Sequence, residues 1–144
     1  MDRAAGDLPQ RGDFKVLRSI PTRWLDNDHY GHVNNVVYYA YFDTAVNGWL
    51  IEATGSDIRD LPAIGIVAET GCRFLHELSF PDVVYAGIGL EKLGNSSVVY
   101  RIVLFANEDR APAAIGRFVH VYVDRDTRRP VPVPEAIRRA VSLL

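Results

Sequence analysis

The sequence predicts an α+β fold in which one long helix packs against one curved antiparallel sheet of five or six strands. A helical repeat of apolar residues fills the region from about 35 to 54. Beyond Gly55 the apolar residues change to a period of two, in runs separated by turn residues. A helix must bury its apolar side, and the sheet is the only large partner that this chain offers.

Length and composition indicate one ordinary globular domain, spanning residues 1–144. The chain is 48% hydrophobic and 24% charged, and its net charge of −2 gives no reason to expect binding to nucleic acid or to an anionic membrane. The single cysteine, Cys72, excludes an internal disulfide and a multi-cysteine zinc site. This cysteine usage is compatible with a reducing compartment, and we expect a cytoplasmic protein.

The first twelve residues are polar and have no apolar core of the kind found in signal peptides, so we expect residues 1–12 to be flexible. No apolar run is long enough to span a membrane. Alternation from Phe14 onward predicts a first strand that ends near Trp24.

The long helix is predicted to run from Asn35 to Thr54. Asn34 is a suitable N-cap and Gly55 a suitable C-terminal stop. Its buried stripe, at spacings of four, three and four residues, consists of Tyr38, Phe42, Ala45 and Trp49.

Four alternating runs follow the helix and are expected to pair as an antiparallel meander. These runs are Ile66–Phe74, Val84–Leu90, Val98–Leu104 and Ile115–Val123. Prolines between 130 and 134 cannot join a central strand. Pro134 suits the first turn of a final helix, expected over 135–144.

The segment Arg23–Asn35, between the first strand and the long helix, carries most of the chemistry. It holds carboxylates, histidines and carboxamides, and Gly31 permits a tight backbone. The helix that begins next supplies unpaired N–H groups, and its dipole favours developing negative charge. An acid or base beside an oxyanion site is the arrangement that acyl transfer requires.

The block Asp-x-Asp-x-x-Gly-His-Val-Asn-Asn, which starts at Asp26, resembles the 4-hydroxybenzoyl-CoA thioesterase family of hot-dog proteins. The resemblance covers nearly the whole chain after Phe14. It continues through Tyr38, Tyr41-Phe42-Asp43-x-Ala45, Phe80-Pro81-Asp82, Gly94-Asn95-Ser96-Ser97 and the proline-rich ending at 129–134.

The resemblance implies an acyl-CoA thioesterase of the hot-dog fold, with no cofactor besides the CoA carried by the substrate. Asp28 would be the catalytic carboxylate, attacking the thioester or activating a water, and the backbone N–H of Asn35 would polarise the carbonyl. His32 is a further catalytic candidate. Candidate substrate contacts are Asn34, Tyr38, Asp43, Lys92, Asn95, Ser96 and Ser97. The family often has basic residues at the turn after Lys92, whereas this turn is Gly94-Asn95-Ser96.

Hot-dog relatives pair their sheets edge to edge, so we expect a homodimer or homotetramer with active sites at the subunit boundary. The closest enzymatic alternative is a hot-dog hydratase, whose Asp-x-Asn-Pro-Leu-His pattern is not matched here. The alternative from another class is a non-catalytic acyl-CoA-binding protein, because a fold alone does not define an activity.

Structural readings compete with the catalytic ones. Asp28 suits a turn, and Asp26 suits a structural role, bonding loop N–H groups or pairing with Arg23. His32 can be a loop histidine with satisfied hydrogen bonds. Asp43, the reserve carboxylate, is expected to be buried with hydrogen bonds or to face the pocket from a partner subunit.

The remaining aromatic, histidine and cysteine residues have plainer interpretations. Tyr38, Tyr41 and Trp49 are interpreted as core or interface aromatics. His76 and His120 are expected in strands, without neighbours that could complete a metal site. Cys72 is expected to be inert core, because it alternates with apolar neighbours.

Overall fold

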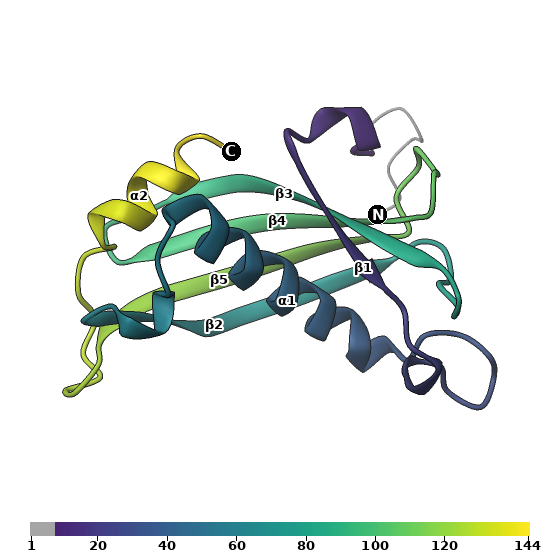
Figure 1. Cartoon of the computed structure of the whole chain (residues 1–144), viewed down its shortest axis with the longest axis horizontal. Helices are drawn as coiled ribbons and strands as arrows, with labels where there is room; N and C mark the ends of the chain where they lie inside the picture. Colours follow the sequence, from purple (N-terminus) through teal and green to yellow (C-terminus); the bar gives the residue numbers. More distant parts are fainter. Residues whose placement is uncertain (1–7) are drawn as a thin grey trace.

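A single antiparallel sheet curves around the long helix α1 in the computed structural model, which describes residues 8–144 (Figure 1). The elements in chain order are η2 (Arg11–Asp13), β1 (Val16–Pro21), η3 (Trp24–Asp26), α1 (Asn35–Thr54), η4 (Ile58–Asp60), β2 (Ala63–Phe74), β3 (Val83–Leu93), β4 (Ser97–Ala106), β5 (Ala114–Asp124) and α2 (Glu135–Val141). This architecture confirms the predicted hot-dog fold. Of the segment expected to be flexible, residues 1–7 lie outside the described part of the chain.

The bounds of α1 match the prediction at both ends, because both caps form. The Asn34 side chain accepts a hydrogen bond from the Val36 N–H at 3.2 Å. Gly55 adopts the left-handed conformation, with φ of 65°, that ends a helix. The predicted stripe is buried, and Phe42 and Ala45 are fully enclosed beneath the sheet.

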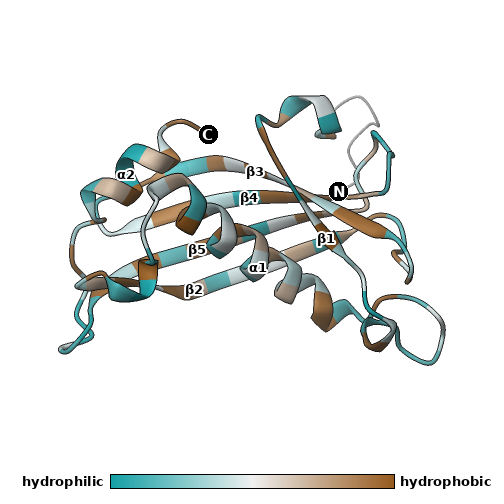
Figure 2. Ribbon diagram, in the orientation of Figure 1, coloured by the Kyte–Doolittle hydropathy of each residue, from teal (hydrophilic) through white to brown (hydrophobic). Residues whose placement is uncertain are grey.

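The five strands lie in the order β1-β3-β4-β5-β2, and every neighbouring pair is antiparallel. Strands β3, β4 and β5 form the expected meander. Strand β2 departs from it, because it pairs with β5 at the far edge instead of with β3. Bands of apolar and polar residues alternate along the strands, as Figure 2 shows, and one face of the sheet packs on α1.

The strands after α1 extend one to three residues beyond the predicted runs at nearly every end. Strand β1 and helix α2 instead end earlier than predicted. Strand β1 stops at Pro21, before Trp24, because Trp24 begins the 3₁₀ turn η3. Helix α2 ends at Val141 and not at Leu144, because the N–H groups of Leu143 and Leu144 bond to carbonyls three residues back.

Strand β2 leaves one long edge of the sheet without a strand neighbour. Three apolar side chains on it are close to half exposed, namely Ile66 at 43%, Val67 at 46% and Phe74 at 49%. Cys72 on the same strand packs against the core as expected, and burial raises the pKa of its thiol to about 12.

Candidate active site

Buried Asp26 fixes the segment between β1 and α1. Its side chain is 1% exposed and accepts hydrogen bonds from the Arg23 N–H and Nε, both at 2.9 Å, and from the Tyr41 hydroxyl at 2.8 Å. Its backbone carbonyl accepts from the Asn34 N–H. Burial raises the pKa of Asp26, but these donors outweigh burial and hold that pKa below its usual value. The structural role predicted for Asp26, including the pairing with Arg23, is confirmed.

Asp28 begins a tight loop, residues 28–32, called here the Asp28 loop. Its N–H donates to the His32 carbonyl at 2.8 Å, and its Oδ1 accepts from the Tyr30 N–H at 2.9 Å. Gly31 has φ of 87°, a conformation that favours glycine. No donor within residues 8–144 bonds Oδ2 of Asp28, so one carboxylate oxygen holds the turn while the other has no partner there.

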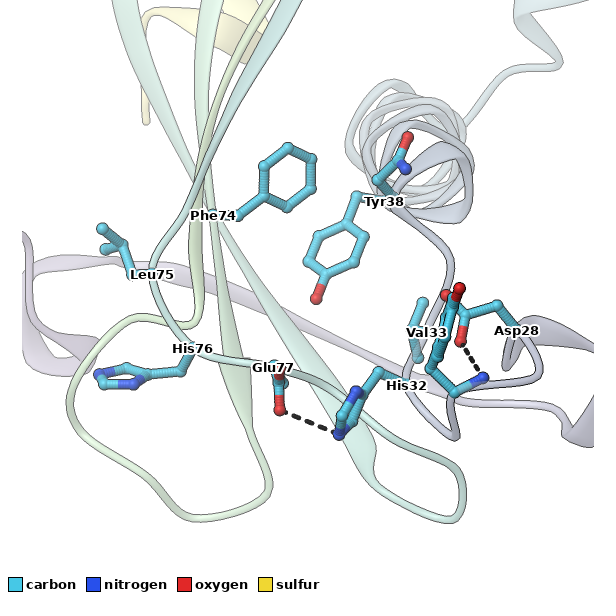
Figure 3. A pocket seen from close by; sticks show the side chains of 10 residues that line it. Asp28, His32, Val33, Tyr38, Phe74, Leu75, His76 and Glu77 are labelled. Carbon is cyan, nitrogen blue, oxygen red and sulfur yellow. Dashed lines mark hydrogen bonds and ion pairs between the residues drawn. The ribbon is translucent and has the colours of Figure 1, made fainter.

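A pocket of about 470 Å³, called here the Asp28 pocket, lies between this loop, the first turn of α1 and the chain that follows β2 (Figure 3). The lining residues are Asp28, Tyr30, His32, Val33, Asn35, Tyr38, Phe74, Leu75, His76 and Glu77. The rings of Tyr38 and Phe74 meet edge to face, with centroids 4.9 Å apart. The pocket therefore joins an apolar aromatic wall to a charged entrance.

Asn35, in the first turn of α1, lines this pocket, and its backbone N–H is an unpaired hydrogen-bond donor. The Asn34 side chain accepts from the Val36 N–H, and its carbonyl accepts from the Val37 N–H. The N–H of Asn35 has no acceptor in the part of the chain that the structure covers. A free N–H at a helix start stabilises negative charge. The Asp28 carboxylate and a residue with a free helix N–H therefore line one cavity.

His32 pairs with a residue that the sequence did not single out. Its Nε2 lies 2.9 Å from Oε2 of Glu77, drawn as a dashed line in Figure 3. The two side chains are 44% and 73% exposed, so the pair contributes little to stability. Its position matters more, because both residues line the Asp28 pocket.

The chain after β2 supplies residues that sequence reasoning missed. His76 lies in this loop and not in a strand as predicted, because β2 ends at Phe74. His76, Glu77 and Leu75 line the Asp28 pocket, yet they belong to no periodic run or motif. Only the Phe80-Pro81-Asp82 stretch that ends this loop carried a sequence signal, and it gave no indication of where the loop folds.

Other predicted site residues lie outside the pocket within one chain. Asn34 serves as the helix cap and is not part of the lining. Asp43 was expected to be buried unless it faces a partner, but it is exposed, and its Oδ1 accepts from the Asn47 amide at 3.0 Å. It sits two turns along α1, on the side turned away from the sheet.

The predicted CoA contacts gather at the turn between β3 and β4. Arg138 of α2 holds this turn by donating to the Gly94 carbonyl at 2.9 Å. Figure 1 places α2 at the end of the sheet opposite the segment that precedes α1. One chain alone therefore does not bring Lys92, Asn95, Ser96 and Ser97 to Asp28.

Residues 8–144 contain no group of three or more His, Cys, Asp or Glu side chains placed to hold a metal ion. No helix among them combines the length and apolar character needed to cross a membrane.

A helix wrapped by an antiparallel sheet, with a carboxylate and a free helix N–H in one pocket, defines a hot-dog protein with a site suited to acyl transfer. Residues 22–141 match the thioesterase-like superfamily, and the chain belongs to that family. It is a thioester hydrolase. Comparison with curated protein sequences gives no match.

Solved structures agree with this assignment. The PA5185 protein of Pseudomonas aeruginosa is 47% identical, with a TM-score of 0.90 over 94% of this chain and 95% of that one. The PA2801 protein of the same species is 32% identical, with a TM-score of 0.80 over 87% and 96% of the two chains. A thioesterase from Thermus thermophilus, complexed with coenzyme A and Zn, is 29% identical, with a TM-score of 0.76 over 90% and 93%.

Proposed function

We propose that the protein hydrolyses acyl-CoA thioesters, with the Asp28 carboxylate as the catalytic group and the Asn35 N–H as the oxyanion donor. The observation that carries this proposal is that both groups, neither of them fully hydrogen-bonded, line one pocket. A thioester carbonyl between them would have a base or nucleophile on one side and a donor at its oxygen.

The reaction then follows from these two groups. In the general-base route, Asp28 takes a proton from a water whose oxygen adds to the thioester carbon. Negative charge gathers on the carbonyl oxygen, where the Asn35 N–H and the dipole of α1 stabilise it. The C–S bond breaks, and the departing sulfur takes the proton from Asp28. In the nucleophilic route, Asp28 displaces the thiolate and forms an anhydride, which water then hydrolyses.

His32 is proposed as an assisting residue. Its Nε2 lies 2.9 Å from Oε2 of Glu77, at the edge of the pocket that contains Asp28. In that position it can orient the attacking water or the thioester, whereas Glu77 acts through it as a positioning residue.

Coenzyme A is the proposed carrier of the acyl group. The relative from Thermus thermophilus was solved with coenzyme A, which supports a CoA thioester here. The narrower assignment to the 4-hydroxybenzoyl-CoA thioesterase family stays a prediction, as does the cytoplasmic location.

We further propose that two chains form a dimer through their β2 edges, and that each partner completes the other's site. Phe74 lines the Asp28 pocket and is also half exposed at this edge, so a second chain docked there would cover the pocket wall. The partner could then bring the turn after Lys92 toward the substrate, which one chain alone does not do.

Thiol release from a panel of acyl-CoAs, with short, long, benzoyl and hydroxybenzoyl groups, tests the activity. Asp28→Asn keeps the size of the side chain and its bond to the Tyr30 N–H but removes the charge. It should lower kcat about 10²–10⁴-fold while binding of a non-hydrolysable analogue changes little. Asp43→Asn is the matched control and should retain most of the turnover.

Isotope labelling separates the two routes. Label found in the Asp28 carboxylate after a single turnover in H₂¹⁸O identifies the nucleophilic route, in which water attacks the Asp28 carbon of the anhydride. General-base catalysis labels only the released acid. Wild-type turnover by an Asp28→Asn enzyme together with an inactive Asp43→Asn enzyme would refute our choice of carboxylate. A wild type that hydrolyses no thioester in the panel would contradict the proposed substrate class.

A further inference from the structure

Tyr38 carries a hydroxyl that the proposed reaction does not use. The residue is 3% exposed and lines the Asp28 pocket. Figure 3 shows the side chain leaving α1 with its hydroxyl directed into the pocket. Tyr41, one turn further along the helix, donates its hydroxyl proton to Asp26 at 2.8 Å, whereas Oη of Tyr38 makes no hydrogen bond within residues 8–144.

The oxygen of this hydroxyl is accessible to a ligand. Among residues 8–144, the fully enclosed side-chain atoms that lack a hydrogen bond are Oη of Tyr100 and Nδ1 of His120. Oη of Tyr38 also lacks a hydrogen bond but is not one of these enclosed atoms, so part of its surface is open. Because the rest of the side chain belongs to the core, that open surface faces the Asp28 pocket.

The Tyr38 hydroxyl is an unused hydrogen-bond donor near neutral pH. Burial raises the pKa of Tyr38, and the Leu78 N–H, which lies nearby without completing a hydrogen bond, lowers it by a smaller amount. The proton therefore stays on the oxygen, and no acceptor among residues 8–144 takes it. A buried donor left unpaired lowers stability, and proteins pair nearly all such groups. An acceptor on a bound substrate would complete the pairing.

The aromatic wall indicates which part of the substrate meets this hydroxyl. Asn35, whose N–H is the proposed oxyanion donor, precedes Tyr38 by three residues, about 4.5 Å along the axis of α1. Tyr38 and Phe74 form the apolar wall of the pocket, with ring centroids 4.9 Å apart. With a thioester carbonyl at Asn35 and Asp28, an apolar acyl chain is the part of the substrate that suits this wall.

The charge of the pocket lining indicates which acceptor fits. Asp28 and Glu77 both line the pocket, and the Glu77 carboxylate lies close enough to Tyr38 to contribute to the rise in its pKa. Both carboxylates would repel a negatively charged group on the acyl chain. An uncharged oxygen of a hydroxyl, ketone or ether accepts a hydrogen bond without this repulsion.

We propose that Tyr38 selects acyl groups that carry an uncharged oxygen, to which its hydroxyl donates a hydrogen bond. This inference rests on the proposed acyl-CoA thioesterase function and names the class of acyl group. A purely aliphatic chain of the same length would leave the hydroxyl unpaired and should therefore be the poorer substrate.

Ether-containing acyl groups isolate this hydrogen bond, because an ether oxygen accepts but cannot donate. Hexanoyl-CoA is compared with analogues in which oxygen replaces the third, fourth or fifth carbon, so chain length stays nearly constant. The wild type should prefer at least one analogue in kcat/KM. The ratio of kcat/KM between that analogue and hexanoyl-CoA should fall roughly tenfold in Tyr38→Phe, because the ether oxygen then meets an apolar wall without a donor.

Tyr39→Phe is the matched control, since Tyr39 is the next residue on α1 and does not line the pocket. It should keep the wild-type ratio. Tyr38→Phe should unfold at a temperature close to that of the wild type, because the hydroxyl that it loses has no partner in the folded chain. A Tyr38→Phe enzyme with the wild-type ratio would overturn the proposal. So would one that slows every chain equally, because that result assigns Tyr38 to the thioester or to the core.

Binding measurements separate this inference from the thioesterase proposal. CoA thioethers with a hexyl chain or its ether analogues are not hydrolysed, so calorimetric titration measures the preference without turnover. An ether preference that Tyr38→Phe removes, in a protein that hydrolyses no thioester, would support the Tyr38 contact and refute the proposed reaction. Turnover of every acyl-CoA with no preference for an ether oxygen would refute the Tyr38 contact alone.

Discussion

Tyr41 connects helix α1 to the active-site segment through one hydroxyl. That hydroxyl donates to Asp26, and burial followed by this bond raises the pKa of Tyr41. Tyr41→Phe leaves the bonds from Arg23 in place but removes one donor to a buried carboxylate. The expected loss is about 1–3 kcal/mol in the free energy of unfolding, together with a lower kcat, because Asp26 holds the segment that carries Asp28.

Chemical denaturation and thiol-release kinetics measure these two effects. Tyr39→Phe is the matched control, since Tyr39 lies on the same helix and its hydroxyl makes no hydrogen bond within residues 8–144. Its free energy of unfolding should stay within about 0.5 kcal/mol of the wild-type value. Equal effects of the two substitutions would show that the Tyr41–Asp26 bond has no special importance.

The burial of His120 predicts how the free energy of unfolding varies with pH. The folded pKa of about 4 lies below the usual 6.5, so the unfolded chain binds the extra proton between these values. The contribution of His120 to the free energy of unfolding is therefore fully present above pH 6.5. It is lost as the pH drops toward 4, a loss of roughly 3 kcal/mol. The adjoining hydroxyls of Tyr100 and Tyr122 have raised pKa values and stay neutral throughout.

Denaturant titrations of wild type and His120→Phe between pH 4 and pH 7 provide the measurement. The wild-type curve should fall more steeply on acidification, and His76→Gln, which changes an exposed histidine, should follow wild type. Parallel curves for wild type and His120→Phe would mean that His120 is not held neutral by burial.

The conformation of the Asp28 loop depends on Gly31. Its φ of 87° is unfavourable for other residues, although a Cβ there would meet no atom within 4 Å. Gly31→Ala should therefore cost about 1–2 kcal/mol through backbone conformation alone and should lower kcat by displacing Asp28. Gly31→Asn should be milder, because asparagine tolerates this conformation better.

Gly12→Ala serves as the control for this prediction, since that position is also open and has no positive φ. The unfolding temperature and the kcat of Gly12→Ala should both stay close to the wild-type values. If Gly31→Ala retained both full stability and full activity, the tight loop would not be what positions the carboxylate.

Local signals explain which elements the sequence could predict. Asn34 and Gly55 act within a few residues of themselves, so the bounds of α1 follow from them. The position of β2 beside β5 depends on pairing between segments about 50 residues apart, which no local pattern encodes. Asp28 and the start of α1 belong to one local motif, so the sequence predicts that they lie close together. Glu77 meets His32 only because the folded chain brings two distant segments together, so no local pattern indicates that pair.

The free edge of β2 determines the assembly that we expect of the whole molecule. A sheet edge with unpaired backbone groups and exposed apolar side chains favours pairing with another chain, and a lysine on such an edge opposes it. Val67, 46% exposed on β2, is the position to change. Val67→Lys should shift the protein from dimer to monomer at micromolar concentration and should lower kcat/KM, because the partner is proposed to cover the pocket wall at Phe74.

Light scattering across a concentration series, run alongside thiol release, measures both effects. Leu143→Lys is the control, since Leu143 is 76% exposed beyond α2 and does not belong to the β2 edge. It should leave mass and activity unchanged. A two-fold dimer doubles any repulsion introduced at this edge, because each chain presents the same strand to the other. Wild-type protein that remains monomeric, or a dimeric Val67→Lys protein with full activity, would mean that each chain completes its own site.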